Sequence, residues 1–457
     1  MFDPLLLPEL REMLLEDDGR AMQEFCEVFH PGIVAENLEA LPVGECWQVL
    51  SKASWRRRAE VFGFFSRARQ MELIATIDKP HVSALLEVMA PDDRVDLLKR
   101  MDTAQVEMLL PLVAQVERDD IRRLLSYPEH SAGSIMTTEY ASLREDVTAR
   151  EALEQLRMQA PDRETIYYVY VIDDARHLRG FVSLRTLILA RPDTLVSELM
   201  DTDVISVRVD EDQEAVANKL ARYDFIAMPV VDNEGRLVGI ITYDDVLDVV
   251  QQEATEDVHR LGGVVPLSER YLDANFVTLW RKRATWLSFL FVAELFTFTA
   301  LSHFEDEIGR IVVLSLFVPL CISTGGNSGS QAATLITRAI ALGHVKLRDW
   351  ARVMRHELSM GLALGATLGI IGFVRAALTA RSVLGEVDRW LLAAVIAQSV
   401  AGICLWGTLV GSALPLVFKR LGIDPGIASS PFVATFVDVT GIVIYFSIAR
   451  SFLLPGS

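Results

Sequence analysis

A single carboxylate stands near the middle of a long apolar stretch close to the end of the sequence. The stretch runs for 19 residues from Pro431 to Ala449, and Asp438 is its one acid. At about 1.5 Å per helical residue it spans the ~30 Å hydrocarbon core of a bilayer, which places Asp438 close to the midplane. An ionised acid there costs at least ~2.5 kcal/mol unless it faces water or a cation. Asp438 therefore indicates an ion path.

Glycines and a proline interrupt the second apolar span, which reads VPLCISTGGNSGSQAATL at 318–335. Such residues weaken a membrane helix, and backbone groups freed at that depth must be satisfied by protein or water. We therefore expect a broken helix whose carbonyl groups, at Gly325 for example, join the Asn327 amide on the ion path. Oxygen ligands of this kind suit Mg²⁺ and its water shell. Close helix packing through small residues is the alternative.

Two further features bear on the ion path. Glu294 is a second acid within an apolar span, and by pattern it lies near a lipid-facing position. It either lines the path or is held by a partner or by the bilayer surface. The alternative for Asp438 is a structural acid bonded to the hydroxyl groups of Thr435 or Thr440.

Charge divides the 457-residue chain into two unlike parts. Residues 1–280 carry 52 of its 62 acidic residues but 29 of its 44 basic residues. The rest is weakly basic and apolar. An acidic field of this strength repels nucleic acid and attracts cations. A basic start and a long apolar run are missing from the first residues, so we expect no signal peptide and a cytoplasmic N-terminal region.

The acidic part contains two kinds of periodicity. Residues 1–130 show short helical units about a dozen residues apart, which favours an all-α helical superhelix of solenoid type. Residues 131–250 contain a duplication in which Met136 matches Met200 and Gly180 matches Gly239. Each copy reads as helix, strand, turn, strand and helix. The duplication resembles a tandem pair of cystathionine-β-synthase-type (CBS) modules, an α/β fold that often binds adenine nucleotides. For this chain the resemblance implies an ATP cleft near Ser183, Thr242 and Asp244.

An amphipathic connector helix, predicted at 251–283, leads into a polytopic α-helical membrane domain at 284–457. Five spans are predicted, at about 284–303, 311–342, 359–378, 390–418 and 431–452. Basic residues set the orientation. Ten fall on one side of the spans: Arg281, Lys282, Arg283, Arg338, Lys346, Arg348, Arg352, Arg355, Lys419 and Arg420. Five fall on the other: Arg310, Arg375, Arg381, Arg389 and Arg450. The N-terminus is therefore expected inside and the C-terminus outside.

The order of helical acidic domain, CBS pair, connector and five spans resembles the MgtE family of magnesium channels. Three segments carry the resemblance: GGNSGSQ at 325–331, DPGIASSPFVATFVDVTG at 424–441 and YDDVLDVVQQEATEDVH at 243–259. The resemblance implies a homodimer in the cell inner membrane with one pore on its two-fold axis and no obligatory protein partner. Two copies of Asp438 would then meet at a hydrated Mg²⁺ ion, with the Asn327 region nearby.

The family resemblance also gives the acidic clusters a role as a gate. Like charges push the cytosolic parts apart, and regulatory Mg²⁺ would bridge them and close the pore. Taken singly, each of these acids has an ordinary explanation as a helix cap or a solvated face. The implied ligands are Asp92, Asp96, Asp224, Asp245, Asp248, Glu253, Glu256, Asp257 and Asp424.

Two other functions stay open at this point. One is a broader divalent-cation carrier regulated by nucleotide on the CBS pair. The other is a membrane-anchored Mg²⁺ sensor without a pore. An enzyme is not expected, because the sequence has no nucleophile elbow, P-loop or HExxH string and its eight histidines are scattered.

Overall fold

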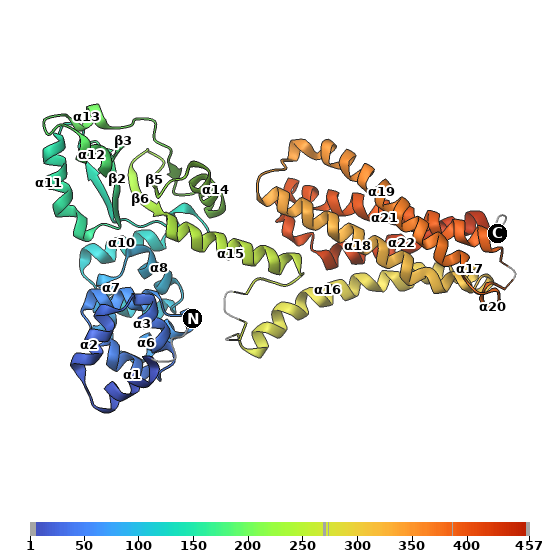
Figure 1. Ribbon diagram of the computed structural model, residues 1–457, viewed down its shortest axis with the longest axis horizontal. Coiled ribbons are helices and arrows are strands. Elements are labelled where there is room, and N and C mark those ends of the chain that lie inside the picture. The colour runs from blue at the N-terminus through green and yellow to red at the C-terminus, as the bar shows by residue number, and fades with distance from the viewer. Residues whose placement is uncertain (1–5, 268–270, 273, 386, 454–457) are drawn as a thin grey trace. The chain divides into compact units, whose positions relative to one another are not determined.

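The computed structural model describes residues 6–267, 271–272, 274–385 and 387–453. The chain divides into two compact units, Met1–Glu253 and Ala254–Ser457 (Figure 1). Each unit has buried apolar clusters of its own. Positions 268–270 and 273 of the expected connector lie outside the described residues, as do both ends of the chain.

From residue 6, where the described part starts, the first unit shows ten short α-helices that stack into a superhelix. One contact recurs along the stack. A glutamate side chain accepts a hydrogen bond from the backbone amide just before a helix that begins about 27 residues later. Glu27 Oε1 accepts from the Ser54 amide and Glu87 Oε1 from the Ala114 amide, each at 3.0 Å. The helices are α1 Leu6–Leu15, α2 Gly19–Val28, α3 Pro31–Glu39, α4 Val43–Leu50, α5 Trp55–Gly63, α6 Arg67–Thr76, α7 Lys79–Val88, α8 Pro91–Lys99, α9 Thr103–Leu109 and α10 Gln115–Leu125.

Two three-stranded sheets follow, one for each copy of the sequence duplication. In each sheet the first two strands are parallel and the last two are antiparallel. The first copy contains β1 Tyr140–Leu143, α11 Ala149–Gln159, β2 Thr165–Ile172, β3 Leu178–Ser183 and α12 Leu184–Leu189. The second contains α13 Val196–Leu199, β4 Val207–Arg208, α14 Gln213–Tyr223, β5 Ala227–Val231, β6 Leu237–Thr242 and α15 Tyr243–Leu261.

The duplicated methionines and glycines pack on one another across the two copies. A Cβ atom on Gly239 would lie 2.8 Å from both the Met136 sulfur and the Thr137 carbonyl oxygen. On Gly180 it would lie 3.1 Å from the Met200 sulfur and 2.7 Å from the Asp201 carbonyl oxygen. Each glycine thus lets a neighbouring segment approach so closely that any side chain would clash with it.

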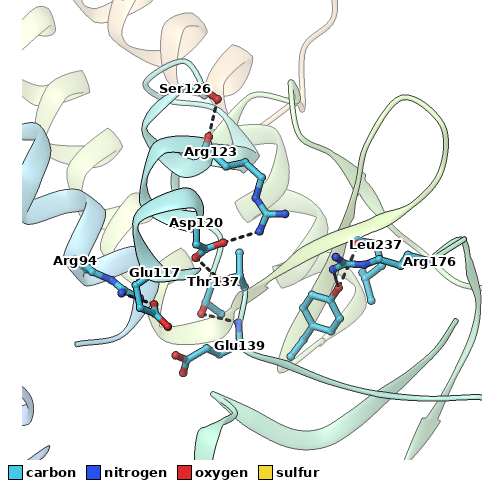
Figure 2. A network of polar contacts seen from close by, with 11 residues as sticks. Arg94, Glu117, Asp120, Arg123, Ser126, Thr137, Glu139, Arg176 and Leu237 are labelled. Carbon is cyan, nitrogen blue, oxygen red and sulfur yellow. Dashed lines mark hydrogen bonds and ion pairs between the residues drawn. The ribbon is translucent and has the colours of Figure 1, made fainter. Parts of the chain in front are cut away.

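The superhelix is joined to the region of the two sheets by a mixed apolar and polar contact. Val95 of α8 and Leu124 of α10 belong to the apolar cluster of the second sheet. Figure 2 shows the polar part, in which Asp120 accepts from Arg123 Nη2 at 2.6 Å. Asp120 also accepts from Thr138 Oγ1 at 2.8 Å. Nearby, the buried Arg94 donates to Glu117 at 2.6 Å.

The second unit is helical. Its main helices are α16 Phe276–His303, α18 Val313–Ala341, α19 Trp350–Ala377, α21 Arg389–Arg420 and α22 Ser430–Leu453. Short helices α17 Glu305–Arg310 and α20 Arg381–Leu384 and the 3₁₀ turn η5 Pro425–Ile427 connect them. Figure 1 shows α18, α19, α21 and α22 alongside one another, and α21 packs on the other three.

Four helical segments in the described part of the chain are long and apolar enough to cross a membrane. They are Phe276–His303, Leu347–Ala377, Arg389–Arg420 and Ser430–Leu453. The expected second span is present as α18, which has 29 residues but is not one of the four. The polar run GGNSGSQ lowers its apolar content. Five membrane helices therefore stay a prediction.

Candidate functional site

Asp438 lies on α22 against a glycine of α18. A Cβ atom on Gly326 would lie 3.2 Å from Asp438 Oδ1 and 3.3 Å from the Ala434 Cβ. Asp438 is half-buried and is the only acid of α22. The missing side chain at Gly326 leaves room for the carboxylate beside the α18 backbone.

The expected break in the second span is wrong. Helix α18 runs without interruption from Val313 to Ala341, with Pro319 inside it. The small residues serve close packing instead, which was the alternative interpretation. A Cβ atom on Gly411 of α21 would lie 2.1 Å from the Gly329 carbonyl oxygen, and Ser328 Oγ donates to the Cys404 carbonyl at 3.2 Å. Glycine permits this backbone approach while the helix keeps its own hydrogen bonds.

The other intramembrane candidates are placed as follows. Asn327 is exposed, and its Nδ2 donates to Ser323 Oγ at 3.3 Å. Gly325 is buried against Ile403 and Val437. The hydroxyl group of Thr440 is engaged away from Asp438: it donates to the Phe436 carbonyl and accepts from Trp406 Nε1, both at 2.9 Å. Glu294 is half-buried and accepts from Thr297 of its own helix at 3.1 Å.

In the first unit, Asp92 and Asp245 form a close carboxyl pair between α8 and α15. Both lie in the first turn of a helix, and their carboxyl groups lie close enough to hydrogen-bond to each other. Burial raises the pKa of Asp92 well above its usual range, and repulsion from Asp245 raises it further. Burial also raises the pKa of Asp245 to about 6, against the effect of a hydrogen bond from Thr242. Asp92 Oδ1 is buried, and no donor among the described residues reaches it.

More acids surround the pair. Burial raises the pKa values of Asp93 and Asp248, and Asp96 adds repulsion to both. Asp96 itself lies 3.5 Å from Arg100 Nη2. Sequence reasoning missed Glu164, whose pKa rises to about 7 through burial first and then repulsion from Asp245 and Asp244. In the sequence, Glu164 stands out only by its position just before β2, and that position does not predict its proximity to the acids of α15.

This arrangement is short of a finished metal site. Within the described residues, no three carboxylate, imidazole or thiol groups stand close enough to hold a metal ion. The pair nevertheless presents oxygen donors and a buried unpartnered oxygen, Asp92 Oδ1. Hard oxygen ligands with room for water fit Mg²⁺, which retains several waters when it binds protein. The residues present therefore fit a partly hydrated Mg²⁺ ion.

Two of the predicted ligands lie apart from the pair. Asp224 is exposed and ends α14 in the left-handed conformation with φ 54°. Glu253 accepts from Gln213 Nε2 at 2.7 Å, and the same nitrogen lies 2.9 Å from His130 Nδ1. Each of these acids thus has a local structural role.

In the second unit, the last turns of α15 meet the segment before α22. Arg260 donates to Glu256 Oε2 at 2.9 Å and also to Asp424 Oδ2. Asp257 Oδ2 lies 3.7 Å from Arg338 Nη1. Burial raises the pKa of Asp257, as does the charge of Asp424, while both arginines lower it. Glu256 and Asp424 therefore bind the same guanidinium, and Asp257 lies close enough to interact with the charge of Asp424. Sequence reasoning missed the part of Arg260, whose i,i+4 spacing from Glu256 was the available signal.

The nucleotide candidates make local contacts. Ser183 Oγ caps α12 through the Thr186 amide at 3.0 Å. Thr242 Oγ1 donates to Asp245 Oδ2, and Asp244 is exposed.

Profiles of three known families match the chain. The profile described as "Divalent cation transporter" matches residues 318–448, and that of the "MgtE intracellular N domain" matches 29–130. The CBS domain profile matches 132–193 and 196–252. The duplication and the N-terminal region are thus members of known domain families.

Full-length relatives are magnesium transporters. Magnesium transporter MgtE of Thermus thermophilus is 41% identical over 455 residues, which make up 98% of each chain. That of Bacillus subtilis is 30% identical over 454 residues, or 99% of this chain and 98% of the relative. Among solved structures, the cytosolic domain of the Mg²⁺ channel MgtE in complex with ATP is 42% identical. It has a TM-score of 0.51 and covers 53% of this chain and 99% of that one. The resemblance drawn from the sequence is confirmed: this chain belongs to the MgtE family of magnesium transporters.

Proposed function

We propose that this protein carries Mg²⁺ across the cell inner membrane and that internal Mg²⁺ closes it. The active form is a homodimer with its N-terminus inside and its C-terminus outside, and α18 is the fifth membrane helix. Two copies of Asp438 face one another at the dimer axis and hold a hydrated ion. Support comes from the full-length relatives and from the position of Asp438.

The observation that carries the transport proposal is the placement of Asp438 beside Gly326. A carboxylate at mid-membrane needs water or a cation, and the absent side chain at Gly326 lets the carboxylate lie beside the α18 backbone. Mg²⁺ gives up its waters reluctantly, so a site with room for the hydrated ion suits it. Asn327, next to Gly326 and exposed, is the amide that would contact those waters.

The closure proposal rests on the acidic contact between α8 and α15. Charge repulsion there opposes the contact, and bound Mg²⁺ removes the repulsion. Asp92, Asp93, Asp96, Asp245, Asp248 and Glu164 are the acids that would share the ions. Moving a two-state equilibrium from 1:99 to 99:1 takes about 5.5 kcal/mol of differential binding, which several weak sites supply together.

ATP is proposed as a second regulator on the CBS pair, near Ser183, Thr242 and Asp244. The support is the ATP complex of a related cytosolic domain. Thr242 also donates to Asp245, so a nucleotide that engages Thr242 would alter the acidic contact.

The test is Mg²⁺ influx into liposomes that contain the full-length chain. We expect Asp438→Asn to lower influx by about tenfold or more, because the amide removes the charge that stabilises the ion. Glu294→Gln is the matched control, since it neutralises the other intramembrane acid, and it should keep most of the flux. Unchanged influx in the Asp438 variant contradicts a pore at this residue. A wild-type protein without flux favours the sensor, and equal flux of Mn²⁺, Co²⁺ or Ni²⁺ favours the broader carrier.

A further inference from the structure

Arg260 connects the end of α15 to the segment that leads into α22. Its Nη2 donates to Glu256 Oε2 at 2.9 Å, one turn earlier on the same helix. Its Nη1 donates to Asp424 Oδ2, 164 residues later in the chain. Helix α22 carries Asp438, so one guanidinium ties the connector to the segment that precedes the helix with the intramembrane acid.

The guanidinium binds one oxygen of Asp424, and the other oxygen caps a turn. Asp424 Oδ1 already accepts from the Gly426 amide at 2.7 Å, which starts the 3₁₀ turn η5. Oδ2 is left, and Arg260 takes it. The Arg260 stem lies close to Gly426, because a Cβ atom added to that glycine would lie 3.1 Å from the Arg260 Cβ.

Acidic side chains lie close enough to repel one another at this place. Three carboxylates, of Glu256, Asp257 and Asp424, share the guanidinium groups of Arg260 and Arg338. The raised pKa of Asp257, with Asp424 among its causes, shows that the acids interact. A divalent cation would relieve this repulsion more fully than one arginine does.

We propose that Arg260 is a built-in competitor of Mg²⁺: its guanidinium holds the Glu256 and Asp424 carboxylates that a regulatory ion would bridge, and so it sets the Mg²⁺ concentration at which the protein closes. The inference rests on the proposed closure by internal Mg²⁺. It adds that the threshold is fixed by a residue that binds no metal.

Displacement of Arg260 by an ion is physically feasible. The side chains of Arg260, Glu256 and Asp424 are 31%, 18% and 35% exposed, so water reaches all three. A guanidinium released here enters water instead of being stranded in an apolar core. If the guanidinium occupies the acids ten times out of eleven, the apparent Mg²⁺ dissociation constant rises about elevenfold, because only the unoccupied fraction can bind the ion.

The experiment measures Mg²⁺ influx into liposomes carrying the full-length chain while the Mg²⁺ concentration on the cytosolic side is varied. We expect Arg260→Gln to lower the half-closing concentration about tenfold, without reducing influx at the lowest internal Mg²⁺. Arg338→Gln is the matched control: its contact with Asp257 is 3.7 Å long and its side chain is 56% exposed, so its shift should stay below about twofold. Arg260→Lys keeps the charge but cannot bridge Glu256 and Asp424 as a guanidinium does. Its half-closing Mg²⁺ concentration should lie between those of the wild type and of Arg260→Gln.

The opposite shift overturns the proposal. If Arg260→Gln needs more Mg²⁺ to close, or the same amount, Arg260 is a latch of the closed state or a bystander. Calorimetric titration of the full-length protein with Mg²⁺ separates this failure from failure of the proposed function. If Arg260→Gln binds Mg²⁺ more tightly but Mg²⁺ does not close the wild-type protein, the competition between Arg260 and Mg²⁺ stands and the proposed closure is rejected. Unchanged binding, with an unfolding midpoint like that of the wild type, would reject the competition.

Discussion

Two helix contacts in this protein are built in opposite ways. Where α18 meets α21, glycines bring the two backbones together, and the Gly411 position lies against the Gly329 carbonyl. Where α8 meets α15, carboxyl groups crowd together, with Asp92 and Asp245 in contact. The first contact is stabilised by backbone packing and is indifferent to ions. The second is opposed by its own charges and depends on what neutralises them.

The difference shows how one chain can combine a fixed frame with a responsive joint. Dispersion between close backbones does not change with pH or Mg²⁺. Repulsion between buried acids changes with both. We therefore expect substitutions in the glycine contact to act on folding alone, and substitutions in the acidic contact to act on the response to protons and Mg²⁺.

The largest effect is expected from filling the glycine contact. Gly411→Ala places a methyl group 2.1 Å from the Gly329 carbonyl oxygen and should destabilise the protein by about 3 kcal/mol or more. Gly402→Ala is the control, because its added Cβ meets Ile444 at 3.8 Å, an ordinary contact. The unfolding midpoint of the detergent-solubilised protein measures both. Equal midpoints would show that α18 and α21 can separate freely.

A smaller effect is expected from pH on the acidic contact. Because folding raises the pKa values of Asp92, Asp245 and Glu164, folding takes up protons, and the unfolding free energy falls as pH rises from about 4 to about 7. The pKa of Asp245 alone, raised to about 6, corresponds to a loss of the order of 2–3 kcal/mol. Chemical unfolding of residues 1–253 with a chelator at pH 5 and pH 8 measures this slope.

Two controls accompany the pH measurement. Asp245→Asn should flatten the slope, whereas Asp193→Asn, at a side chain 93% exposed, should leave it unchanged. Millimolar Mg²⁺ should restore stability at pH 8. A slope that is the same in all three proteins would place the proton uptake elsewhere.

The smallest effect is expected at a hydrogen bond that joins α22 to α18. Tyr445 is buried, and its hydroxyl group donates to the Leu314 carbonyl at 2.8 Å. Tyr445→Phe removes that donor without changing the packing and should cost about 1 kcal/mol. Tyr271→Phe, at a tyrosine 65% exposed, should cost nothing measurable in the same thermal unfolding experiment. Equal midpoints for the two variants would show that this bond adds no stability.

The sequence could predict features that depend on local pattern. The match of Met136 with Met200 and of Gly180 with Gly239 predicted the duplicated CBS modules, and the apolar run around Asp438 predicted its helix. The continuity of α18 could not be predicted, because packing against α21 overrides the weak helix propensity of its glycines. Contacts between distant segments were also out of reach: nothing in the sequence joins Glu164 to Asp245 or Arg260 to Asp424.

The central claim is that the acidic contact between α8 and α15 lets internal Mg²⁺ close the protein. The direct measurement is Mg²⁺ influx into liposomes at graded internal Mg²⁺, for the wild type and for the double variant Asp92→Asn, Asp245→Asn. We predict that the variant conducts as well as the wild type at low internal Mg²⁺ and stays open where the wild type closes. Closure of the variant at the wild-type Mg²⁺ concentration would contradict the account.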